Sequence, residues 1–305
     1  MIKNDDSVSQ LSSALIKAKA KSLGFDDCGI SPAGEVPHFS DTLQEWISHG
    51  RHAGMHFMEE NLDKRCNPQK LLPGAQSIIS VVVGYKPSDT MQGPVRIARY
   101  AYGEDYHEKI KRMLFALIAA IKEDYPDFEA KPCVDTVPIS DKYWAYRSGL
   151  GWIGKNTLLV TPNMGSMVNI GELVTIAPFD HYDRPIPNRC GDCTLCLKAC
   201  PNHALADTLD CRRCNAYNTI ENRSETLPPD LRLNGYVFGC DCCQQVCPYN
   251  IQAEPRIQIS SDRLQTLESL PQATEPEFKQ ITKHTALNRI KYPQWRRNVE
   301  KIRQN

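Results

Sequence analysis

The sequence predicts a mixed fold of the α+β or α/β class, in which an N-terminal domain precedes a small cysteine-rich domain and a short helical tail. Two observations predict this order. Apolar residues at helical and at strand spacing alternate over residues 1–180, and ten of the thirteen cysteines lie between Cys190 and Cys247. The proline-rich stretch "PFDHYDRPIPNR" between these regions is typical of a linker. We therefore expect domains at 1–180, 181–255 and 256–305, the last without an extended repeat.

Regular elements can be placed in order along the first domain. Residues 9–24, "SQLSSALIKAKAKSLG", predict a helix closed by Gly24, and residues 77–85, "SIISVVVGY", predict a buried strand. Residues 172–177, "ELVTIA", predict a further strand. Residues 108–124 carry an apolar stripe at helical spacing, which indicates core packing rather than a cofactor surface. The stripe comprises Ile110, Met113, Leu114, Leu117, Ile118 and Ile121.

The stretch "GLGWIGKN", residues 149–156, resembles two nucleotide-binding motifs. It satisfies G-x-G-x-x-G, and it misses the P-loop pattern by one residue, Asn156. Both motifs need a strand before the glycines and a helix after them, so that phosphate meets the helix N-terminus. Here "SDKYWAYRS", with Ser140 as N-cap, predicts a helix before, and "TLLVT" predicts a strand after. We therefore interpret the glycines as a helix cap and a place of close backbone approach.

Composition excludes several classes of protein. The 305 residues include 36 basic and 36 acidic side chains, so the formal net charge is zero, which argues against strong non-specific binding to nucleic acid. Hydrophobic residues make up 41% of the chain, enough for a packed core. No apolar run approaches the length that spans a bilayer. The N-terminal 25 residues contain neither the apolar region of a secretory signal nor a twin-arginine pair, which predicts a cytosolic protein.

The cysteine spacing is the most specific signal in the chain. "CGDCTLCLKACP" has the spacing C-x2-C-x2-C-x3-C-P of bacterial ferredoxins, in which three thiolates bind one [4Fe–4S] cluster and the fourth binds the other. "CDCCQQVCP" is a second copy that lacks its first cysteine, and Cys214 can replace the missing ligand. The spacing assigns Cys190, Cys193, Cys196 and Cys247 to one cluster, and Cys200, Cys214, Cys240 and Cys243 to the other.

Zinc is the alternative occupant. Cys211-x2-Cys214 and Cys240-x2-Cys243 both have zinc-knuckle spacing. A zinc site, however, needs neither the Cys-Pro step nor its duplication, so we favour iron–sulfur clusters. Cys211 and Cys242 are interpreted as bystander thiols.

Two clusters conduct single electrons, so the first domain should hold a redox centre that receives them. Flavin and cobalamin both meet this requirement. The cobalamin-ligating pattern D-x-H-x-x-G nearly occurs at "DYHEKI", but Ile110 occupies the glycine position. We therefore interpret His107 as a half-buried histidine in the first turn of a helix, and any cobalamin would lack a protein histidine ligand.

Asp135 in "KPCVDTVPIS" is the candidate proton donor. Its apolar neighbours predict a raised carboxyl pKa, which would keep the group protonated. The alternative is that Asp135 only caps a turn through its own backbone.

Five linked motifs carry a family resemblance that extends over roughly residues 10–300. "KPCVDTVPIS", "RSGLGWIGKNTLLV", "CGDCTLCLKACPNHAL", "RCNAYNTIE" and "GCDCCQQVCPYN" together resemble the epoxyqueuosine reductases. The resemblance implies a cobalamin enzyme with two [4Fe–4S] clusters, related in layout to reductive dehalogenases. Its reaction reduces the epoxide of epoxyqueuosine, at the wobble position of tRNA, to the alkene of queuosine. It also implies that Asp135 protonates the epoxide oxygen.

The resemblance further implies which residues bind cobalamin, several of them through backbone atoms. The eight cysteines assigned above coincide with the cluster ligands of the family. Two departures are notable: Cys242 stands where relatives usually carry an acidic or small polar residue, and the helical repeats with which many relatives hold tRNA do not follow here. The implied cobalamin contacts are Arg65, Ala98, Asp135, Leu159, Ile170, Ala216, Arg223, Asp241 and Cys242.

The expected partners are a tRNA anticodon loop and a cytosolic electron donor, with the protein a monomer. From Lys283 onward the tail has seven Lys or Arg residues and one Glu, which indicates either contact with phosphates or a solvated helix face. Two other functions fit the motifs. One is a cobalamin-dependent reductive dehalogenase, and the other is a dicluster ferredoxin-like carrier that binds no cobalamin.

Overall fold

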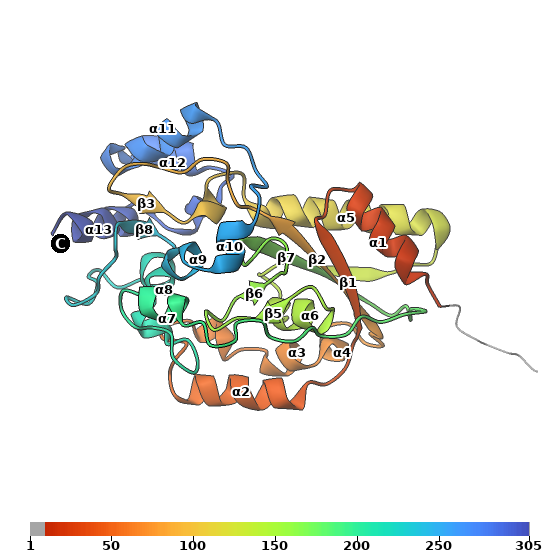
Figure 1. Ribbon diagram of the computed structural model, residues 1–305. Coiled ribbons are helices and arrows are strands. Elements are labelled where there is room, and N and C mark those ends of the chain that lie inside the picture. The colour runs from red at the N-terminus through yellow and green to blue at the C-terminus, as the bar shows by residue number, and fades with distance from the viewer. Residues whose placement is uncertain (1–9, 305) are drawn as a thin grey trace, which may run out of the picture.

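A computed structural model of the protein describes residues 10–304. At its centre is a four-stranded sheet in the order β1–β2–β7–β4, in which every neighbouring pair is antiparallel. The sheet supports helices on both faces (Figure 1). Two of its strands were expected from the sequence, although β7 begins four residues earlier than predicted. The strands are β1 (Asp27–Pro32), β2 (Ser77–Gly84), β4 (Ala130–Cys133) and β7 (Val168–Thr175).

One face of the sheet is covered by α1 (Ser13–Ser22) and α5 (Tyr106–Asp124). Ser12 caps α1 by accepting the Leu15 N–H, and Asp105 caps α5 by accepting the His107 N–H. The predicted apolar stripe of α5 is confirmed. Its residues Ile110, Leu114, Leu117 and Ile121 are buried against the sheet, while Met113 and Ile118 are partly buried beside them.

The opposite face holds α6 (Asp141–Arg147), the predicted helix before the glycine motif. Gly149 ends it with a φ of +74°, a conformation that favours glycine. The helix lies very close to the sheet, because a Cβ on Gly29 of β1 would overlap the carbonyl oxygen of Ser148. The chain then forms the hairpin β5 (Trp152–Ile153) and β6 (Leu159–Val160). The interpretation of "GLGWIGKN" as a cap that leads into a strand is therefore confirmed.

The cysteine-rich part consists of short elements without a large core of its own. Four helices and a 3-10 turn carry or flank the cysteines. These are α7 (Leu195–Ala199), η3 (Cys211–Arg213), α8 (Asn215–Ile220), α9 (Cys242–Gln245) and α10 (Pro248–Gln252). Residues 178–189, the predicted linker, contain no regular element.

The C-terminal tail is helical, as expected, and it completes a further hydrophobic core. This core joins residues 91–106, the strand β8 (Tyr236–Phe238) and the tail. In it β3 (Arg96–Ile97) pairs with β8 in parallel. Phe278 and Trp295 are its largest tail residues, with ring centroids 5.3 Å apart. The tail helices are α11 (Ser261–Ser269), α12 (Glu275–Thr282) and α13 (Tyr292–Arg303).

The remaining elements connect these layers. Between β1 and β2 lie α2 (Pro37–Ser48), η1 (His56–Met58), α3 (Leu62–Cys66) and α4 (Pro68–Leu71). Three further 3-10 turns are η2 (Arg99–Ala101), η4 (Leu270–Gln272) and η5 (Ala286–Arg289). Within residues 10–304, no helix has both the length and the apolarity needed to cross a membrane.

Asn298 on α13 fixes the tail to the cysteine-rich part, which gives a test of this packing. Its buried Nδ2 donates to the carbonyl oxygens of Thr219 and Val237, each at 2.9 Å. We expect Asn298→Ala to lower the free energy of unfolding by about 2–3 kcal/mol, because both carbonyls lose a buried donor. Urea unfolding followed by circular dichroism measures this. The exposed Arg303→Ala is the control, and equal midpoints for the two variants would contradict the assignment.

Candidate active site

Four cysteines of the first predicted cluster line one cavity. Cys190, Cys193, Cys196 and Cys247 border a space of about 290 Å³. Trp152 Nε1 donates to Cys190 Sγ over 3.4 Å, and the Trp152 ring packs edge-on against Tyr249. The glycine motif therefore lines part of this cavity through Lys155 and Asn156, and it contacts Cys190 through Trp152. The structure brings together the four thiols that the spacing assigned to one cluster.

The second predicted group lies deeper in the cysteine-rich part. Burial raises the pKa of the Cys214 and Cys243 thiols, and in both cases the Cys200 thiol adds to the shift. The backbone N–H of Ala204 donates to Cys200 Sγ over 3.2 Å, a contact that stabilises a thiolate. Cys240 lies beside Cys243, one turn earlier on the segment leading into α9.

Burial separates the predicted ligands from the bystander thiols. All eight predicted ligands are partly exposed. Cys211 and Cys242 are only 4% and 5% exposed, and burial raises the pKa of Cys211 to about 12. Cys242 Sγ accepts a hydrogen bond from Asn234 Nδ2 at 3.3 Å. Cys211 therefore behaves as a small buried group, whereas the hydrogen bonds with Cys240 and Asn234 lower the pKa of Cys242 to about 7.

The spacing of the sulfur atoms argues against zinc. Bonds of about 2.3 Å to one tetrahedral ion place sulfurs within about 4 Å of one another. Among residues 10–304, one group of three or more His, Cys, Asp or Glu side chains has ligand atoms within 4.8 Å of one another, and it contains no cysteine. A four-iron cube suits a wider arrangement, because each thiolate binds a different iron.

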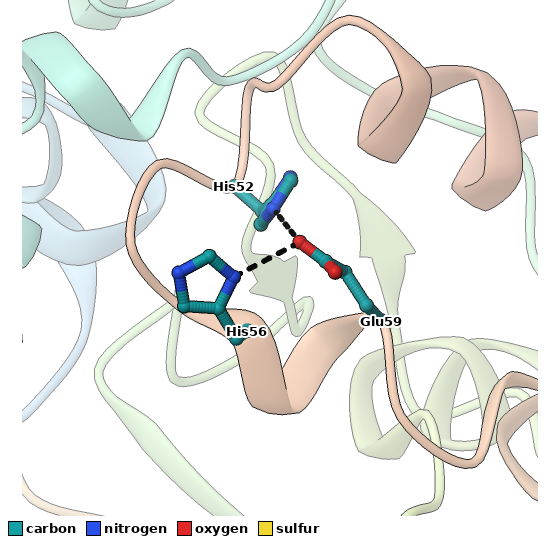
Figure 2. Close-up of side chains that lie close together, drawn as sticks. All are labelled: His52, His56 and Glu59. Carbon is teal, nitrogen blue, oxygen red and sulfur yellow. Dashed lines mark hydrogen bonds and ion pairs between the residues drawn. The ribbon is translucent and has the colours of Figure 1, made fainter.

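That compact group is His52, His56 and Glu59, on the segment between α2 and α3 (Figure 2). Both imidazoles point at one carboxylate oxygen, with His52 Nε2 2.6 Å and His56 Nδ1 3.2 Å from Glu59 Oε1. The hydrogen bonds from His56 and then His52 lower the Glu59 pKa. These hydrogen bonds connect the two ends of the segment between His52 and Glu59.

The same segment is attached to the cysteine-rich part and to Arg65. The Arg51 carbonyl accepts the Cys211 N–H at 2.8 Å, and the Gly54 N–H donates to the Tyr217 hydroxyl at 2.9 Å. Arg65 Nη2 donates to the Phe57 carbonyl at 3.0 Å. Its Nε is buried and has no hydrogen-bond partner among the described residues. Arg65 is therefore held through Nη2, and its Nε–H is left without a partner in residues 10–304.

Asp135 lies in the turn between β4 and α6, with a φ of +46°. Its side chain is 60% exposed, and its Oδ2 accepts two hydrogen bonds from the start of α5. Tyr106 donates its hydroxyl at 2.7 Å, and His107 Nε2 lies at 3.2 Å. The other ring nitrogen of His107, Nδ1, lies 2.7 Å from Asp105 Oδ1. Both ring nitrogens face carboxylate oxygens, an arrangement that favours the doubly protonated imidazolium form of His107.

The expectation of a raised pKa for Asp135 is wrong. The hydrogen bond from His107 lowers the pKa of Asp135, burial opposes this, and Tyr106 lowers it further. The neighbours in sequence are apolar, but the neighbours in space are polar. The pKa of His107 shifts in the opposite direction. Burial alone would lower this pKa, but the hydrogen bonds to Asp135 and Asp105 outweigh burial and raise it. The proton shared by this pair therefore resides on His107.

His107 occupies the first turn of α5, as predicted, but the sequence did not reveal its partner. Tyr106, stacked on the His107 ring with centroids 4.0 Å apart, was also missed. The sequence feature that pointed to this group was the near-match of "DYHEKI" to the cobalamin-ligating pattern. Its role could not be inferred, because it depends on the contact of His107 with Asp135, 28 positions away in the chain.

The other residues implied by the resemblance come from both parts of the chain. Leu159 and Ile170 belong to one apolar cluster beside α6. The Ala98 N–H donates to the Phe238 carbonyl at 2.8 Å. Asp241, 1% exposed, accepts the Arg99 N–H at 2.9 Å, and burial raises its pKa to about 6. Ala216 lies on α8 next to Cys214.

Arg223 follows α8 and is exposed. Its Nη1 donates to Gln294 Oε1 of α13 at 2.6 Å, so the tail orients it. Ala98, Asp241 and Arg223 thus form contacts between different parts of the chain, whereas Leu159 and Ile170 lie within the first domain.

Comparison with known proteins agrees with this arrangement. Residues 65–136 match a family model described as epoxyqueuosine reductase QueG, DUF1730. Residues 189–250 match a 4Fe-4S double cluster binding domain. An epoxyqueuosine reductase of Leadbetterella byssophila is 36% identical over 95% of this chain and 97% of its own. One from a Synechocystis species is 40% identical over 89% of this chain and 98% of its own.

Solved structures of epoxyqueuosine reductases are similar over most of the fold. That from Streptococcus thermophilus matches with a TM-score of 0.86 and 29% identity, covering 95% of this chain and 80% of its own. A structure with an epoxyqueuosine-modified tRNA-Tyr stem loop matches with a TM-score of 0.81 and 31% identity, with the same coverage. In one from Bacillus subtilis, matching with a TM-score of 0.83, the catalytic aspartate loop is swung out of the active site. The cysteine-rich part is thus a double-cluster iron–sulfur domain, and the chain belongs to the epoxyqueuosine reductase family.

Proposed function

We propose that this chain reduces the epoxide of epoxyqueuosine in a tRNA anticodon loop to the alkene of queuosine. The observation that carries the proposal is family membership over nearly the full length of the curated relatives. The relative bound to a modified stem loop supports the substrate. An anticodon loop is single-stranded, so its base can be inserted into a pocket at modest cost.

The reaction defines what the site must supply. Opening the three-membered ring and forming the alkene consumes two electrons and two protons, and releases the oxygen as water. The eight thiols would hold two four-iron clusters, which pass electrons singly from a cytosolic donor. We propose the assignment made from the spacing: Cys190, Cys193, Cys196 and Cys247 for one cluster, and Cys200, Cys214, Cys240 and Cys243 for the other.

We propose cobalamin as the second cofactor. When bound, its reduced cobalt supplies the electrons that break the C–O bond. The unpartnered, buried Nε of Arg65 suits an acceptor group on such a ligand. Backbone contacts at Ala98, Ala216 and Cys242 and apolar contacts at Leu159 and Ile170 would complete the site. The full set is Arg65, Ala98, Asp135, Leu159, Ile170, Ala216, Arg223, Asp241 and Cys242.

The proton would travel along the hydrogen-bonded groups around Asp135. His107 would hold a proton at Nε2, 3.2 Å from Asp135 Oδ2, and the side chain of Asp135 is 60% exposed, so a substrate can reach it. Asp135 would pass this proton to the epoxide oxygen, and His107 would then restore it. Because burial keeps the Tyr106 pKa above its ordinary value, Tyr106 remains a donor and orients the carboxylate.

We also propose that the turn carrying Asp135 can leave this position, as the catalytic loop does in the Bacillus subtilis relative. The basic tail is a weaker candidate for phosphate contact than its sequence indicates. Arg289 forms an ion pair with Glu221 at 2.9 Å, and Arg297 donates to backbone carbonyls. Lys283, Lys291 and Arg303 remain exposed and could meet phosphates. We propose that the enzyme acts as a cytosolic monomer.

Asp135→Asn tests the proton donor. The amide keeps the shape but cannot transfer a proton, so we expect single-turnover reduction of modified stem loop to slow by about 10²–10⁴-fold. The exposed Asp127→Asn is the matched control and should react at the wild-type rate. Turnover by Asp135→Asn at the wild-type rate would show that the donor is another group.

The raised His107 pKa predicts a pH dependence. Since the proton is needed, the rate should fall as pH rises through the raised pKa of His107. His107→Gln should be slower and should lack this alkaline decline. A pH profile of the single-turnover rate measures both. An identical alkaline decline in His107→Gln would assign the decline to a different group.

Metal content separates the proposed enzyme from its rivals. Protein prepared anaerobically with cobalamin should contain about eight irons and one cobalt per chain, because each cluster holds four irons. Cys214→Ser should lose about half of the iron, while Cys211→Ser, which alters a buried bystander, should keep all of it. Full iron without cobalt would favour the ferredoxin-like carrier. Zinc in place of iron would overturn the cluster assignment, and conversion of a halogenated phenol but not the modified stem loop would favour a dehalogenase.

A further inference from the structure

Two carboxyl groups near the Asp135 turn, the buried Glu172 and the half-buried Asp141, have no part in the mechanism above. Glu172 is on the central strand β7 and is 0% exposed. In the sheet it is paired with Ser80 on one side and with Cys133 on the other. Asp141 is the first residue of α6, which packs on this face.

Three of the four carboxyl oxygens of the pair lack ordinary hydrogen-bond donors. Asp141 Oδ1 and both carboxylate oxygens of Glu172 are buried, and none has a hydrogen-bond partner among the described residues. Yet the two side chains are close enough to hydrogen-bond to each other. Two carboxyl groups can make that bond only if one of them carries a proton.

No cation neutralises the pair within the described part of the chain. The charged groups that face it are Arg65 from α3, Lys142 from α6 and Asp135 from the turn, and the titratable Cys133 thiol faces it from β4. Arg65 Nη2 donates instead to the Phe57 carbonyl at 3.0 Å, and Lys142 Nζ donates to the Thr157 carbonyl at 2.8 Å.

The pair contacts the Asp135 turn directly. The backbone N–H of Asp135 stabilises the ionised form of Asp141. Such a contact stabilises a backbone conformation, with a φ of +46°, that residues with a side chain seldom adopt. The far end of the turn is attached separately, through Ser140 Oγ, which donates to the Arg65 carbonyl at 3.3 Å.

We propose that Asp141 and Glu172 form a carboxyl pair that shares one proton, and that the ionised Asp141 holds the turn where Asp135 meets Tyr106 and His107. Asp141 is then a positioning residue. Glu172 carries the shared proton, and its hydrogen bond stabilises the negative charge of Asp141 away from water. This inference rests on the proposed role of Asp135 only where activity is concerned. The position of the turn can be measured without it.

The direction of the pH effect follows from the order in which the two groups ionise. Burial raises the pKa of Asp141 to about 7 and raises that of Glu172 well above its usual range. Both oxygens of Glu172 are buried without a partner, whereas only Oδ1 of Asp141 is, so near pH 8 Asp141 carries the charge and Glu172 the proton. As pH falls through about 7, Asp141 becomes protonated, its attraction for the Asp135 N–H is lost, and the turn is released.

Three full-length proteins test the pair: wild type, Asp141→Asn and Glu172→Gln. Infrared spectra in D2O at pH 8 should show the carbonyl stretch of a protonated carboxyl in wild type, because surface carboxyls are ionised at this pH. Glu172→Gln should lack this band. Its persistence in that variant, or its absence from wild type, would overturn the proton assignment.

Hydrogen exchange of residues 134–140, followed by mass spectrometry at pH 8, tests the effect on the turn. Asp141→Asn removes the charge, so exchange should be about 10- to 100-fold faster than in wild type. Glu172→Gln keeps a neutral donor beside Asp141 and should exchange like wild type. Equal protection in Asp141→Asn and wild type, with both folded by circular dichroism, would reject the positioning role.

Activity gives the third readout. Asp141→Asn should slow single turnover by about 10- to 100-fold and lose the decline below pH 7, whereas Glu172→Gln should keep both the rate and the decline. If Asp135→Asn reacts at the wild-type rate while the spectra and exchange behave as expected, the donor assignment fails and the carboxyl pair stands. If the spectra or the exchange fail while Asp135→Asn is inactive, the pair is rejected and the donor assignment stands.

Discussion

The close approach of α6 to the sheet is the constraint on which the candidate site depends. It is permitted by the missing side chain of Gly29, where a Cβ would overlap the Ser148 carbonyl. Because α6 lies so near β1, its first residue reaches the central strand, and the turn before it is brought over the start of α5. The residues after it enter the β5–β6 hairpin, whose Val160 lines the first thiol cavity and whose Trp152 donates a hydrogen bond to Cys190 Sγ. A helix seated farther from the sheet would separate these groups.

The elements with a clear period could be predicted from the sequence. The apolar stripe of α5, the buried run of β2 and the helix before "GLGWIGKN" all have local signals that the fold keeps. The strands β1 and β4 had none. "DCGISP" is short and buried in its middle residues, and "AKPC" contains a proline, which is tolerated because β4 is an edge strand. Their places in the sheet are set by pairing between segments far apart in the chain.

In the candidate site, too, local features could be predicted from the sequence and contacts between distant segments could not. Cysteine spacing is a local property, so the four thiols at one cavity could be grouped from the sequence. The environment of Asp135 is not local. Its sequence neighbours Val134 and Val137 are apolar, but the groups that set its charge, Tyr106 and His107, arrive from a different helix. A pKa inferred from adjacent residues therefore had the wrong sign. The Asp141–Glu172 contact was invisible for the same reason.

The parallel pairing of β3 with β8 has a consequence for how such chains can evolve. One strand belongs to the first domain and the other to the cysteine-rich part, and the core around them is completed by the tail. Severing the chain at its proline-rich linker would leave an unmatched strand and an open apolar surface on each fragment. We therefore expect that the iron–sulfur part cannot be transferred by recombination to another protein as an independently folding domain. The whole chain should be inherited as one unit.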